Sequence, residues 1–599
     1  MRVDKKLFSG AEALVYLLEK FEVKNVFAYP GTSELTLCNE VLNSKSIKLI
    51  NGRGDKEAAF MAAGASLLQP LQSIAILHGA RGLTNAAGAI GDAFRNEIGT
   101  LFIVGLPTVA SSKFFPPHGE QNLISAIGNF TKYSVEIDDC ASTSDDFEVQ
   151  KSKVFSYVTS IVRCIELSKQ PPFGPVIIGI PQDVLEKKWI NKNFVKKFKV
   201  SLQKEKLTKT SITKNLITKI NKSKNIIIFV DDFLYKNSKA KKFLPIFAKK
   251  LNAPIFQVHY NRGPMCFEST NQESNTFFAG YYYPSDSRYK NIFQKADLII
   301  TLEDRNMYKR VVGQFPECAK IAITTNLRMT EKNEYIPKQD IVCVDDIERT
   351  LKSIYQKCKS RRSINKFTVE CLNLHKYKES TKTGYTSVFD TITDEISSLF
   401  KKASYPILVD DSQMFGGVLR NYYSKYPDNL RVFGDHGGFV GGGISLASGL
   451  STLEKDKFVV CTLGDQGFMN ALQGLVACKE NCKNFLMIVC NNGQSVSLTK
   501  QSLSQNSTSF YNGAHFFLAN AKQDYIKIAE SFGIFAKSID LRSGLNILTK
   551  RKLKRYFDWA YKLRSKGPVL LELRVSGDWK LWGDIWSTDG NDTNRVDNL

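Results

Sequence analysis

The stretch from Phe458 to Ser495 reads FVVCTLGDQGFMNALQGLVACKENCKNFLMIVCNNGQS. Its two short apolar runs, Phe458–Leu463 and Phe485–Cys490, are rich in β-branched and aromatic residues and are bounded by polar breakers, which predicts buried strands. The residues between them predict a helix from about Phe468 to Glu480. The stretch is therefore a βαβ unit, and it indicates a fold built on parallel α/β sheets.

Polar residues follow each of these two strands. The tetrapeptide Gly464–Gly467 follows the first strand, and Asn491-Asn492 follows the second. Open α/β sheets bind ligands outside the carboxyl ends of their strands. One carboxylate, one amide oxygen and a nearby backbone carbonyl suit a hard divalent cation, and they leave positions for a diphosphate and water. The pattern therefore predicts a cation and phosphate site at this edge of the sheet.

Asp465 and Asn492 are 27 positions apart. This pattern resembles the thiamine diphosphate (ThDP) motif, which opens with Gly-Asp-Gly and closes with Asn-Asn at the same separation. Gln466 stands in place of the third residue of Gly-Asp-Gly, and Gly467 is next to it. An ordinary Rossmann-like strand pair with an Asp N-cap and an Asn turn is the alternative. The resemblance implies Mg²⁺ ligands at Asp465, Asn492 and the Gln494 carbonyl, and cofactor contacts at Gly464, Asp465, Gln466, Gly467, Asn492 and Gln494.

Composition is that of a globular protein with several domains. The chain has 599 residues, of which 43% are hydrophobic and 24% charged. No apolar stretch is long enough to span a membrane, and the amino-terminal residues carry no cleavage signature, so we expect a cytoplasmic protein without a membrane partner. The twelve cysteines are scattered without CxxC pairs, which favours reduced thiols over a disulfide or zinc framework.

The formal net charge is +23. Much of the lysine excess falls in two stretches, residues 187–224 and 352–382. Neither stretch has aromatic residues interleaved as in nucleic-acid recognition motifs, zinc-ligand spacing or heptads. A solvated surface therefore explains the charge better than nucleic-acid binding, which we regard as the less favoured function class.

The amino-terminal region predicts a helix from Gly10, a strand at Val26–Tyr29 and a Pro30-Gly31 turn that opens a further helix. This order resembles the opening of the pyrimidine-binding (PYR) domain of acetolactate synthase-like ThDP enzymes. The resemblance places Gly31 among the cofactor-binding residues.

A small-residue helix follows the next strand, in the sequence NGRGDKEAAFMAAGASLL. In the family, a Glu at the start of this helix hydrogen-bonds the aminopyrimidine ring of the cofactor. Counting back without a gap from Ala58 and Gly64 places Asp55 at that position, one methylene shorter than Glu. Glu57 is the neighbouring carboxylate, although residues two apart on a helix face different directions. An N-cap role for Asp55 is the alternative.

Two further candidates come from the segments after the strand at Ser73–Leu77. Arg81 stands where the family has Pro in a Gly-Pro-Gly segment, and it could recognise an anionic substrate or form a surface salt bridge. His118 stands where acetolactate synthases have an aromatic residue, in a loop that borders the catalytic pocket. A histidine there could relay protons near neutral pH or stay solvent-exposed without a role.

A second α/β pattern begins near Lys224 and resembles the central domain of the same family. Some family members bind FAD in this domain. No glycine-rich phosphate fingerprint follows its first predicted strand, where Asp231-Asp232 would repel phosphates. We therefore expect no FAD. The residues at 303–305 predict a capped loop rather than a site.

The third pattern resembles the diphosphate-binding (PP) domain. A strand at Pro406–Val409 precedes a turn where Ser412 and Gln413 are expected to contact the diphosphate. The glycine cluster VFGDHGGFVGGGISLASGLS follows, and it includes Gly438, a candidate cofactor contact. Val440 falls where the family keeps a bulky apolar side chain wedged under the cofactor. His436 in the same cluster could face the diphosphate or solvent.

The resemblance covers nearly the whole chain and implies three doubly wound, parallel-sheet α/β domains: PYR at 1–187, a linker and central domain at 188–365, and PP with a tail at 366–599. It implies a ThDP- and Mg²⁺-dependent carboligase or decarboxylase acting on a 2-oxo acid and an acceptor. Because PYR of one family subunit faces PP of another, it also implies a homodimer or homotetramer. Two alternatives stay open, a catalytically silent family member and a basic nucleic-acid-associated protein.

Overall fold

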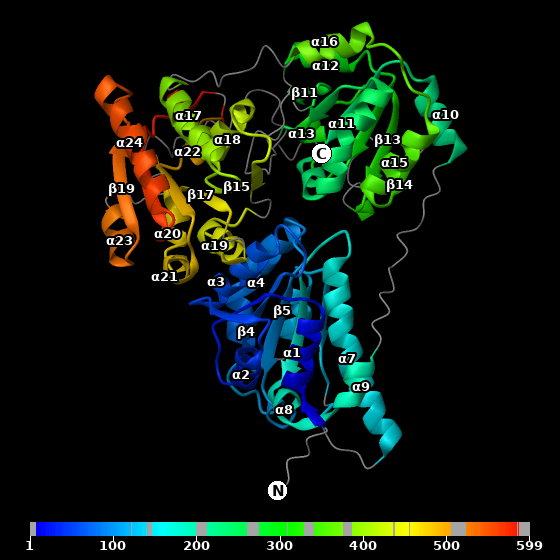
Figure 1. The fold of residues 1–599 in the computed structure, drawn as a ribbon, viewed down its shortest axis with the longest axis vertical. Helices are drawn as coiled ribbons and strands as arrows, with labels where there is room; N and C mark the ends of the chain where they lie inside the picture. Colours follow the sequence, from blue (N-terminus) through cyan, green and yellow to red (C-terminus); the bar gives the residue numbers. More distant parts are fainter. Residues whose placement is uncertain are drawn as a thin grey trace.

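The structure is a computed structural model in which three α/β units lie at the corners of a triangle (Figure 1). It describes residues 7–583 and 585, except 121, 139, 142–145, 199–212, 260–274, 285, 308, 329–340, 375–385, 435–437, 454–455 and 505–522. Each unit has a six-stranded sheet whose strands are all parallel, with helices on its faces. The expected fold class is confirmed.

The first unit has the strand order β3-β2-β4-β5-β7-β6. An antiparallel pair of short strands, β1 (Leu7–Ser9) and β8 (Lys188–Asn191), lies beside it. The strands of the main sheet are β2 (Asn25–Ala28), β3 (Lys48–Asn51), β4 (Ser73–His78), β5 (Leu101–Leu106), β6 (Tyr133–Glu136) and β7 (Val176–Pro181). The helices are α1 (Gly10–Lys20), α2 (Leu35–Asn43), α3 (Asp55–Ala65), α4 (Gly79–Arg95), α5 (Val109–Ser112), α6 (Leu123–Gly128), α7 (Phe147–Lys169), α8 (Gln182–Glu186) and α9 (Lys192–Lys197).

The second unit corresponds to the expected central domain, and its strand order is β11-β10-β9-β12-β13-β14. Its strands are β9 (Ile226–Val230), β10 (Ile255–Gln257), β11 (Phe278–Tyr281), β12 (Leu298–Leu302), β13 (Ala319–Thr324) and β14 (Ile341–Val344). Its helices are α10 (Lys214–Lys222), η1 (Asp232–Lys236), α11 (Ser238–Leu251), α12 (Ser287–Phe293), α13 (Lys309–Val312), α15 (Ile347–Lys357) and α16 (Lys366–Leu374).

The third unit has the order β16-β15-β17-β18-β20-β19. Its strands are β15 (Pro406–Asp411), β16 (Arg431–Gly434), β17 (Phe458–Gly464), β18 (Phe485–Asn491), β19 (Phe535–Asp540) and β20 (Val569–Arg574). Its helices are α17 (Thr386–Lys402), α18 (Met414–Asn421), η3 (Tyr423–Lys425), α19 (Gly443–Leu453), α20 (Asp465–Asn470), α21 (Gly474–Asn481), α22 (Val496–Ser504), α23 (Tyr525–Ser531), α24 (Ile547–Leu563) and η5 (Trp579–Trp582).

The first and third sheets have the same topology, because each arranges its strands second, first, third, fourth, sixth and fifth in chain order. Strand order reverses between the first and third strands of each. These strands are β2 and β4 in the first unit, which corresponds to the expected PYR domain, and β15 and β17 in the third unit, which corresponds to the expected PP domain. The central sheet has the order third, second, first, fourth, fifth and sixth, and it reverses between β9 and β12. Ligands bind at such switch points, outside the carboxyl ends of the strands.

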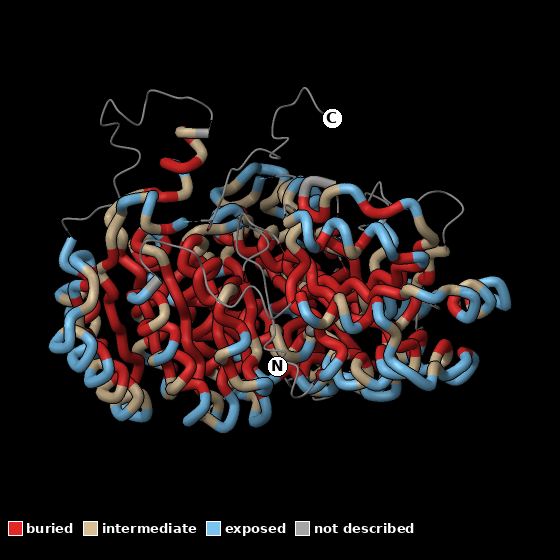
Figure 2. The backbone as a smooth tube through the Cα atoms, turned by 90° about the horizontal axis from the view of Figure 1, so that it is seen from above, coloured by how far each residue is buried: buried red, intermediate tan, exposed pale blue. Residues whose placement is uncertain are grey.

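Helix α3 of PYR and helix α19 of PP pack against each other with backbone in close approach. A Cβ added at Gly64 would strike the Leu446 carbonyl oxygen, and one added at Gly449 would strike the Met61 carbonyl oxygen. Small residues are therefore required where these helices meet. Buried residues run through the middle of the molecule (Figure 2), and one buried hydrophobic cluster includes residues of both α3 and α19.

The βαβ unit at 458–495 differs from expectation in one respect. Both strands form as expected, but two helices, α20 and α21, take the place of the single helix from Phe468 to Glu480. The residues between them are held from outside the unit, because Gln473 Nε2 donates a hydrogen bond to the Arg53 carbonyl of PYR at 2.7 Å. The contact between domains thus overrides the local helical pattern.

The structure also bears on the expected state of the cysteines and on the search for membrane-spanning segments. Eleven of the twelve cysteines lie in the described part of the chain, and the structure has all eleven as free thiols. Among the described residues, no helix is both long and apolar enough to cross a membrane.

Candidate active site

A cavity of about 370 Å³ opens at the switch point of the PP sheet, beyond the ends of β15, β17 and β18. It brings together most of the residues that the sequence assigned to the cofactor: Ser412, Gln413, Val440, Gly464, Asp465, Gln466, Gly467, Asn492 and Gln494. Its other lining residues are Asp411, Met414, Phe415, Cys490, Ser495, Val496, Ser497, Leu498 and Trp582. Thus residues from segments up to 171 positions apart, from Asp411 to Trp582, share one cavity.

Asp465 is a buried carboxylate of the cavity wall that backbone hydrogen bonds hold in place. Its side chain is 5% exposed, and its two oxygens accept backbone N–H bonds from Gln466 at 2.8 Å and Gly493 at 2.9 Å. Burial raises the pKa of Asp465 to about 6, although these backbone bonds pull the other way. The ionised carboxylate is therefore costly in this cavity, and a bound cation would lower that cost.

The two loops that carry the predicted metal ligands are joined to each other. Gln466 Nε2 donates to Ser495 Oγ at 2.7 Å, and the Gly493 backbone N–H donates to Asp465 Oδ2 at 2.9 Å. Within the second loop, the Gln494 backbone N–H donates to Asn492 Oδ1 at 3.1 Å. Gln466, which stands in place of the family's Gly, thus links the two loops. The described residues contain no group of three or more His, Cys, Asp or Glu side chains placed to hold a metal. A site here would use one carboxylate with amide and carbonyl oxygens, as Mg²⁺ accepts.

Asp411 is a lining residue that the sequence analysis did not identify as a site residue. Its Oδ2 accepts the backbone N–H groups of Gly441 at 3.1 Å and Gly443 at 3.0 Å, so it holds the glycine cluster in place. The adjacent Asp410 accepts the Ser412 hydroxyl and, at 2.7 Å, the Thr462 hydroxyl. Burial raises the pKa of Asp410. The Asp-Asp sequence at the end of β15 could have signalled this role.

The glycine cluster contributes less to the cavity than expected. Val440 lines it, but Gly438 does not; Gly438 is exposed and has a φ of +75°, a conformation that favours glycine. His436 lies outside the described residues. Of the described residues of this cluster, Val440 alone lines the cavity.

A second cluster lies at the equivalent switch point of PYR. Glu34 is fully buried, and its Oε2 lies 2.9 Å from His78 Nδ1, at the end of β4. The Gly31 backbone N–H donates to the same oxygen at 3.1 Å, and a Cβ at Gly31 would strike the His78 ring. Burial raises the pKa of Glu34, while hydrogen bonds from His78, Gly31 and Gly79 lower it in part. Gly31 thus belongs to this cluster and not to the PP cavity.

Asp55 joins the cluster from the start of α3. The His78 backbone N–H donates to Asp55 Oδ1 at 3.1 Å, the Asp55 side chain is 8% exposed, and burial raises the pKa of Asp55. The N-cap alternative is wrong, because Gly54 occupies the N-cap position and Asp55 is the first helical residue. Glu57 lies apart from Asp55. It forms an ion pair with Lys56 at 3.0 Å, on the side of α3 that faces Gln473 of PP.

His118 and Arg81 flank this cluster. The His118 ring centroid lies 4.6 Å from that of His78, its Nδ1 is buried without a hydrogen-bond partner among the described residues, and its φ is +69°. Arg81 is 61% exposed and forms an ion pair with Glu120. Of the two readings offered for Arg81, the surface salt bridge is therefore the one that forms.

The sequence analysis missed Glu34 and His78. Both lie at carboxyl ends of parallel strands or in the turn that follows, the same position that identified Asp465. Reading the Pro30-Gly31 turn and the end of β4 with that rule could have found them. None of the PYR residues named here lines the PP cavity, so the described chain presents two half-sites at equivalent switch points.

Two known domain families match this chain, and each covers one of the two half-sites. Residues 8–128 match the family described as "Thiamine pyrophosphate enzyme, N-terminal TPP binding domain", and residues 415–573 match "Thiamine pyrophosphate enzyme, C-terminal TPP binding domain". These segments contain the PYR cluster and most of the residues that line the PP cavity. The chain therefore belongs to the thiamine pyrophosphate enzyme family.

Within this family, its curated relatives include acetolactate synthase large subunits. That of Buchnera aphidicola subsp. Schizaphis graminum is 23% identical over 95% of both chains, and the isozyme 1 large subunit of Escherichia coli is 22% identical over 96% of both. Solved structures of similar fold include benzoylformate decarboxylase from Polynucleobacter necessarius, with TM-score 0.73 and 18% identity over 95% of this chain and 99% of that one. A second is the thiamine diphosphate-dependent 4-hydroxybenzoylformate decarboxylase of Rhodococcus jostii RHA1, with TM-score 0.71 and 17% identity over 96% and 100%. The chain is thus a ThDP-dependent enzyme related to acetolactate synthases.

Proposed function

We propose that this enzyme uses ThDP and Mg²⁺ to decarboxylate a 2-oxo acid, to transfer the resulting acyl unit to an acceptor, or to do both. The charge of the PP cavity carries the proposal. Two buried carboxylates, Asp411 and Asp465, line it, and no lysine, arginine or histidine is among its described lining residues. A diphosphate cannot enter such a cavity without a cation that offsets its charge.

Three oxygen donors at one end of the cavity fit that cation. Asp465 would supply the single carboxylate, Asn492 its amide oxygen and Gln494 its backbone carbonyl. Ser412 and Gln413, at the turn after β15, would contact the diphosphate, and Val440 would pack against the cofactor between its two ends. The cofactor, when bound, supplies stabilisation of the carbanion that remains when carbon dioxide leaves.

The PYR cluster would provide the acid and base groups. Asp55 would accept and return a proton at the aminopyrimidine ring, and its raised pKa suits that exchange. Glu34 would hold the His78 ring in one tautomer, with Nδ1–H directed to the carboxylate and Nε2 available. His78 and the adjoining His118 would then move protons at the substrate.

The separation of the two half-sites supports a dimer. The PYR cluster shares no described lining residue with the PP cavity of the same chain. We propose that a second copy of the chain supplies the missing half, with its PYR cluster facing this PP cavity. Two equivalent sites would result, as expected for a two-fold symmetric homodimer.

The positions at which this chain departs from the acetolactate synthase pattern include Asp55, Arg81, His118 and Val440. We therefore favour a carboligase or decarboxylase of specialised metabolism over a housekeeping acetolactate synthase. The pairing of Arg81 with Glu120 argues against Arg81 as the main anchor for an anionic substrate. His118, which lies beside His78, is the stronger candidate of the two for contact with substrate.

The test is thiamine- and magnesium-dependent carbon dioxide release from a panel of 2-oxo acids, first alone and then with aldehyde or 2-oxo acid acceptors. Acceleration that disappears in Asp465→Ala, and persists in Asp428→Ala on an exposed turn of the same domain, would support the proposal. Tight ThDP binding without turnover of any panel member would instead identify a catalytically silent relative. Absence of metal-dependent ThDP binding would overturn the proposal.

A further inference from the structure

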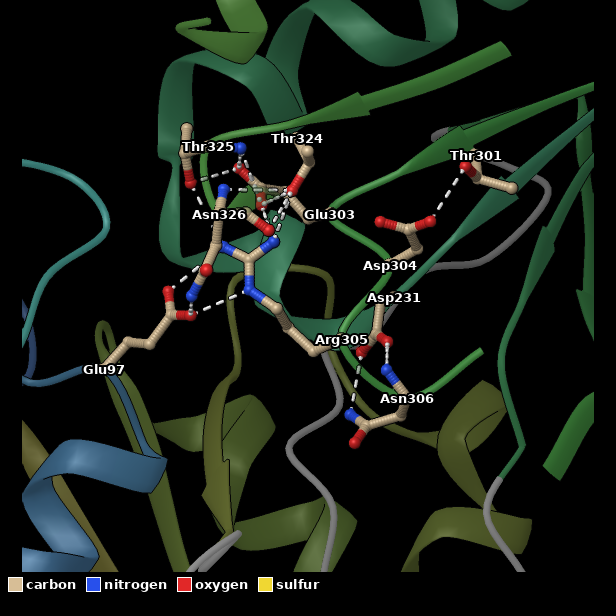
Figure 3. A network of polar contacts seen from close by, with 10 residues as sticks. All are labelled: Glu97, Asp231, Thr301, Glu303, Asp304, Arg305, Asn306, Thr324, Thr325 and Asn326. Carbon is tan, nitrogen blue, oxygen red and sulfur yellow. Dashed lines mark hydrogen bonds and ion pairs between the residues drawn. The ribbon is translucent and has the colours of Figure 1, made fainter. Parts of the chain in front are cut away.

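The switch point of the central sheet lies between β9 and β12, where doubly wound sheets bind dinucleotides. The chain that leaves these strands here carries Asp231 after β9 and Glu303-Asp304-Arg305 after β12. Figure 3 shows Glu303 and Arg305 converging with Glu97, which enters from the PYR domain just beyond α4. Asp231 and Asp304 are directed away from Glu97, to Asn306 and Thr301. The sequence predicted a capped loop at 303–305. These residues do lie in the loop after β12, and the structure adds that all three are buried and hydrogen-bonded there.

Arg305 is the centre of that network. Its side chain is 2% exposed, and its Nε and Nη2 donate to the two oxygens of Glu97 at 2.7 and 3.1 Å (Figure 3). This is a bidentate pairing of a guanidinium with a carboxylate, the geometry that also suits a phosphate. Asn326 Nδ2 donates to Glu97 Oε1 at 2.8 Å, so the Glu97 carboxylate is held by two residues of the central domain.

Other groups of the central domain hold Arg305 ready for this carboxylate. Thr324 and Thr325 hydroxyls accept from its guanidinium at 2.8 and 3.1 Å. Glu303 forms a further ion pair with it and accepts the Thr325 hydroxyl at 2.9 Å. Glu303 has a φ of +57°, which is uncommon for a residue with a side chain and places this carboxylate beside Arg305. Arg305 therefore sits in a built site.

The charges of the crevice select for a carboxylate. Burial acts to raise the pKa of Glu97, but the attraction of Arg305 outweighs it and the pKa is lowered. Asp231, Asp304 and Glu303 are all buried nearby, and a dinucleotide's phosphates would meet their negative charge. Burial raises the pKa of Glu303, the other carboxyl group paired with Arg305, so the guanidinium charge is balanced chiefly by Glu97.

This joint differs from the other two between domains. The central and PP domains meet through rings, with Tyr281 and Phe278 centred 4.9 and 5.9 Å from Tyr423. PYR and PP meet through the close backbone contact of α3 and α19 and through the half-exposed ion pair of Arg53 with Glu480. The contact of PYR with the central domain at Glu97 is instead a buried ion pair with additional hydrogen bonds, and an anion can compete for it.

We propose that the switch-point crevice of the central domain is a carboxylate-binding site, and that Glu97 of PYR is its resident ligand. Arg305 recognises this carboxylate where related topologies recognise a dinucleotide phosphate. The crevice thus fixes the docking of PYR on the central domain, and α4, which begins beside His78, is anchored at its far end.

Replacement of the ligand tests this. Glu97→Ala leaves Arg305 buried with a vacant carboxylate position, so the melting temperature of the full-length protein should fall by about 5 °C or more. Acetate or formate should restore most of that loss in a saturable way, while sodium chloride at equal ionic strength should not. Glu480→Ala removes the carboxylate partner of the half-exposed Arg53 and should show no acetate dependence.

Two further variants keep the test decisive if Glu97→Ala folds poorly. Glu97→Gln preserves side-chain volume and should show a smaller loss that acetate does not restore, because the amide still fills the position. Arg305→Met in the Glu97→Ala background should abolish the acetate effect. An unchanged melting temperature in Glu97→Ala, or equal effects of acetate and chloride, would overturn the proposal.

Discussion

His78 Nδ1 lies 2.9 Å from Glu34 Oε2, and the backbone N–H of the same histidine donates to Asp55 Oδ1 at 3.1 Å. One residue thus connects two buried carboxylates that come from different turns of the PYR sheet. The Glu34 hydrogen bond orients the imidazole ring, and the Asp55 hydrogen bond fixes the carboxylate that we assign to the cofactor ring. Three of the predictions below rest on these two hydrogen bonds of His78.

The Glu34 carboxylate can be neutralised without changing its shape. In Glu34→Gln we expect turnover to fall roughly 100-fold, the lower end of what a positioned acid or base supplies. The reason is that the negative charge of Glu34, which orients the His78 ring, is lost. Steady-state kinetics would measure it. Glu120→Gln, an exposed carboxylate of the same domain, should leave turnover unchanged, and equal rates in both variants would remove Glu34 from the chemistry.

The same variant should shift stability with pH. The pKa of Glu34 is raised in the folded state, so the folded protein binds this proton more tightly than the unfolded chain does. The stability that this provides is present at low pH and is lost as the pH rises through the folded pKa. Melting temperatures of Glu34→Gln relative to wild type should therefore rise as the pH increases above 4.5, the ordinary pKa of a glutamate. A difference that does not change with pH would contradict the assignment.

Asp55 and Glu57 can be distinguished by proton exchange at the thiazolium carbon of bound ThDP. Asp55→Ala should fold and bind ThDP with Mg²⁺, yet lose roughly 100-fold or more in exchange rate. Asp55→Glu should keep or raise the rate. Glu57→Ala is the matched control, since Glu57 pairs with Lys56 and faces PP. Slow exchange in Glu57→Ala with normal exchange in Asp55→Ala would reverse our assignment.

Asp465→Ala should bind ThDP and Mg²⁺ far more weakly than wild type. The reason is that Asp465 is the only carboxylate among the three proposed ligands, and Asp411 is already engaged with Gly441 and Gly443. Calorimetric titration of magnesium ThDP measures the affinity, with Asp428→Ala as the control. Unchanged affinity in Asp465→Ala would show that the metal binds elsewhere.

Two inactive variants should complement each other if the active site lies between subunits. Asp55→Ala and Asp465→Ala mixed in equal amounts, unfolded and refolded together, should regain about a quarter of wild-type activity, because half the dimers are mixed and each has one intact site. Each variant refolded alone is the control. No recovery in a mixture shown to contain mixed dimers would place both halves in one chain.

Purified protein should be colourless. Arg305, a cation of the central switch point, is already bound by Glu97 and Glu303, and Asp231 adds negative charge there. A flavin absorption band that survives gel filtration would contradict this expectation.

Part of this architecture could be predicted because it is local. Short apolar runs followed by Gly-Asp-Gln-Gly and by Asn-Asn identify parallel strands and the groups at their carboxyl ends, and the order of such runs identifies three α/β units. Asp465, Asn492 and Gln494 fall together for the same reason, since neighbouring parallel strands end at one edge of the sheet.

Other features depended on residues that only the tertiary structure brings together. Glu34 meets His78 across 44 positions, and Glu97 meets Arg305 across 208, so neither pairing leaves a local pattern in the chain. The helix after β17 breaks where Gln473 bonds to Arg53 of another domain, although its sequence favours continuity. The polar groups at the strand ends follow from the local pattern of apolar runs and polar breakers, so the sequence alone predicts them. Burial and the pairing of distant charges depend on how the three sheets pack.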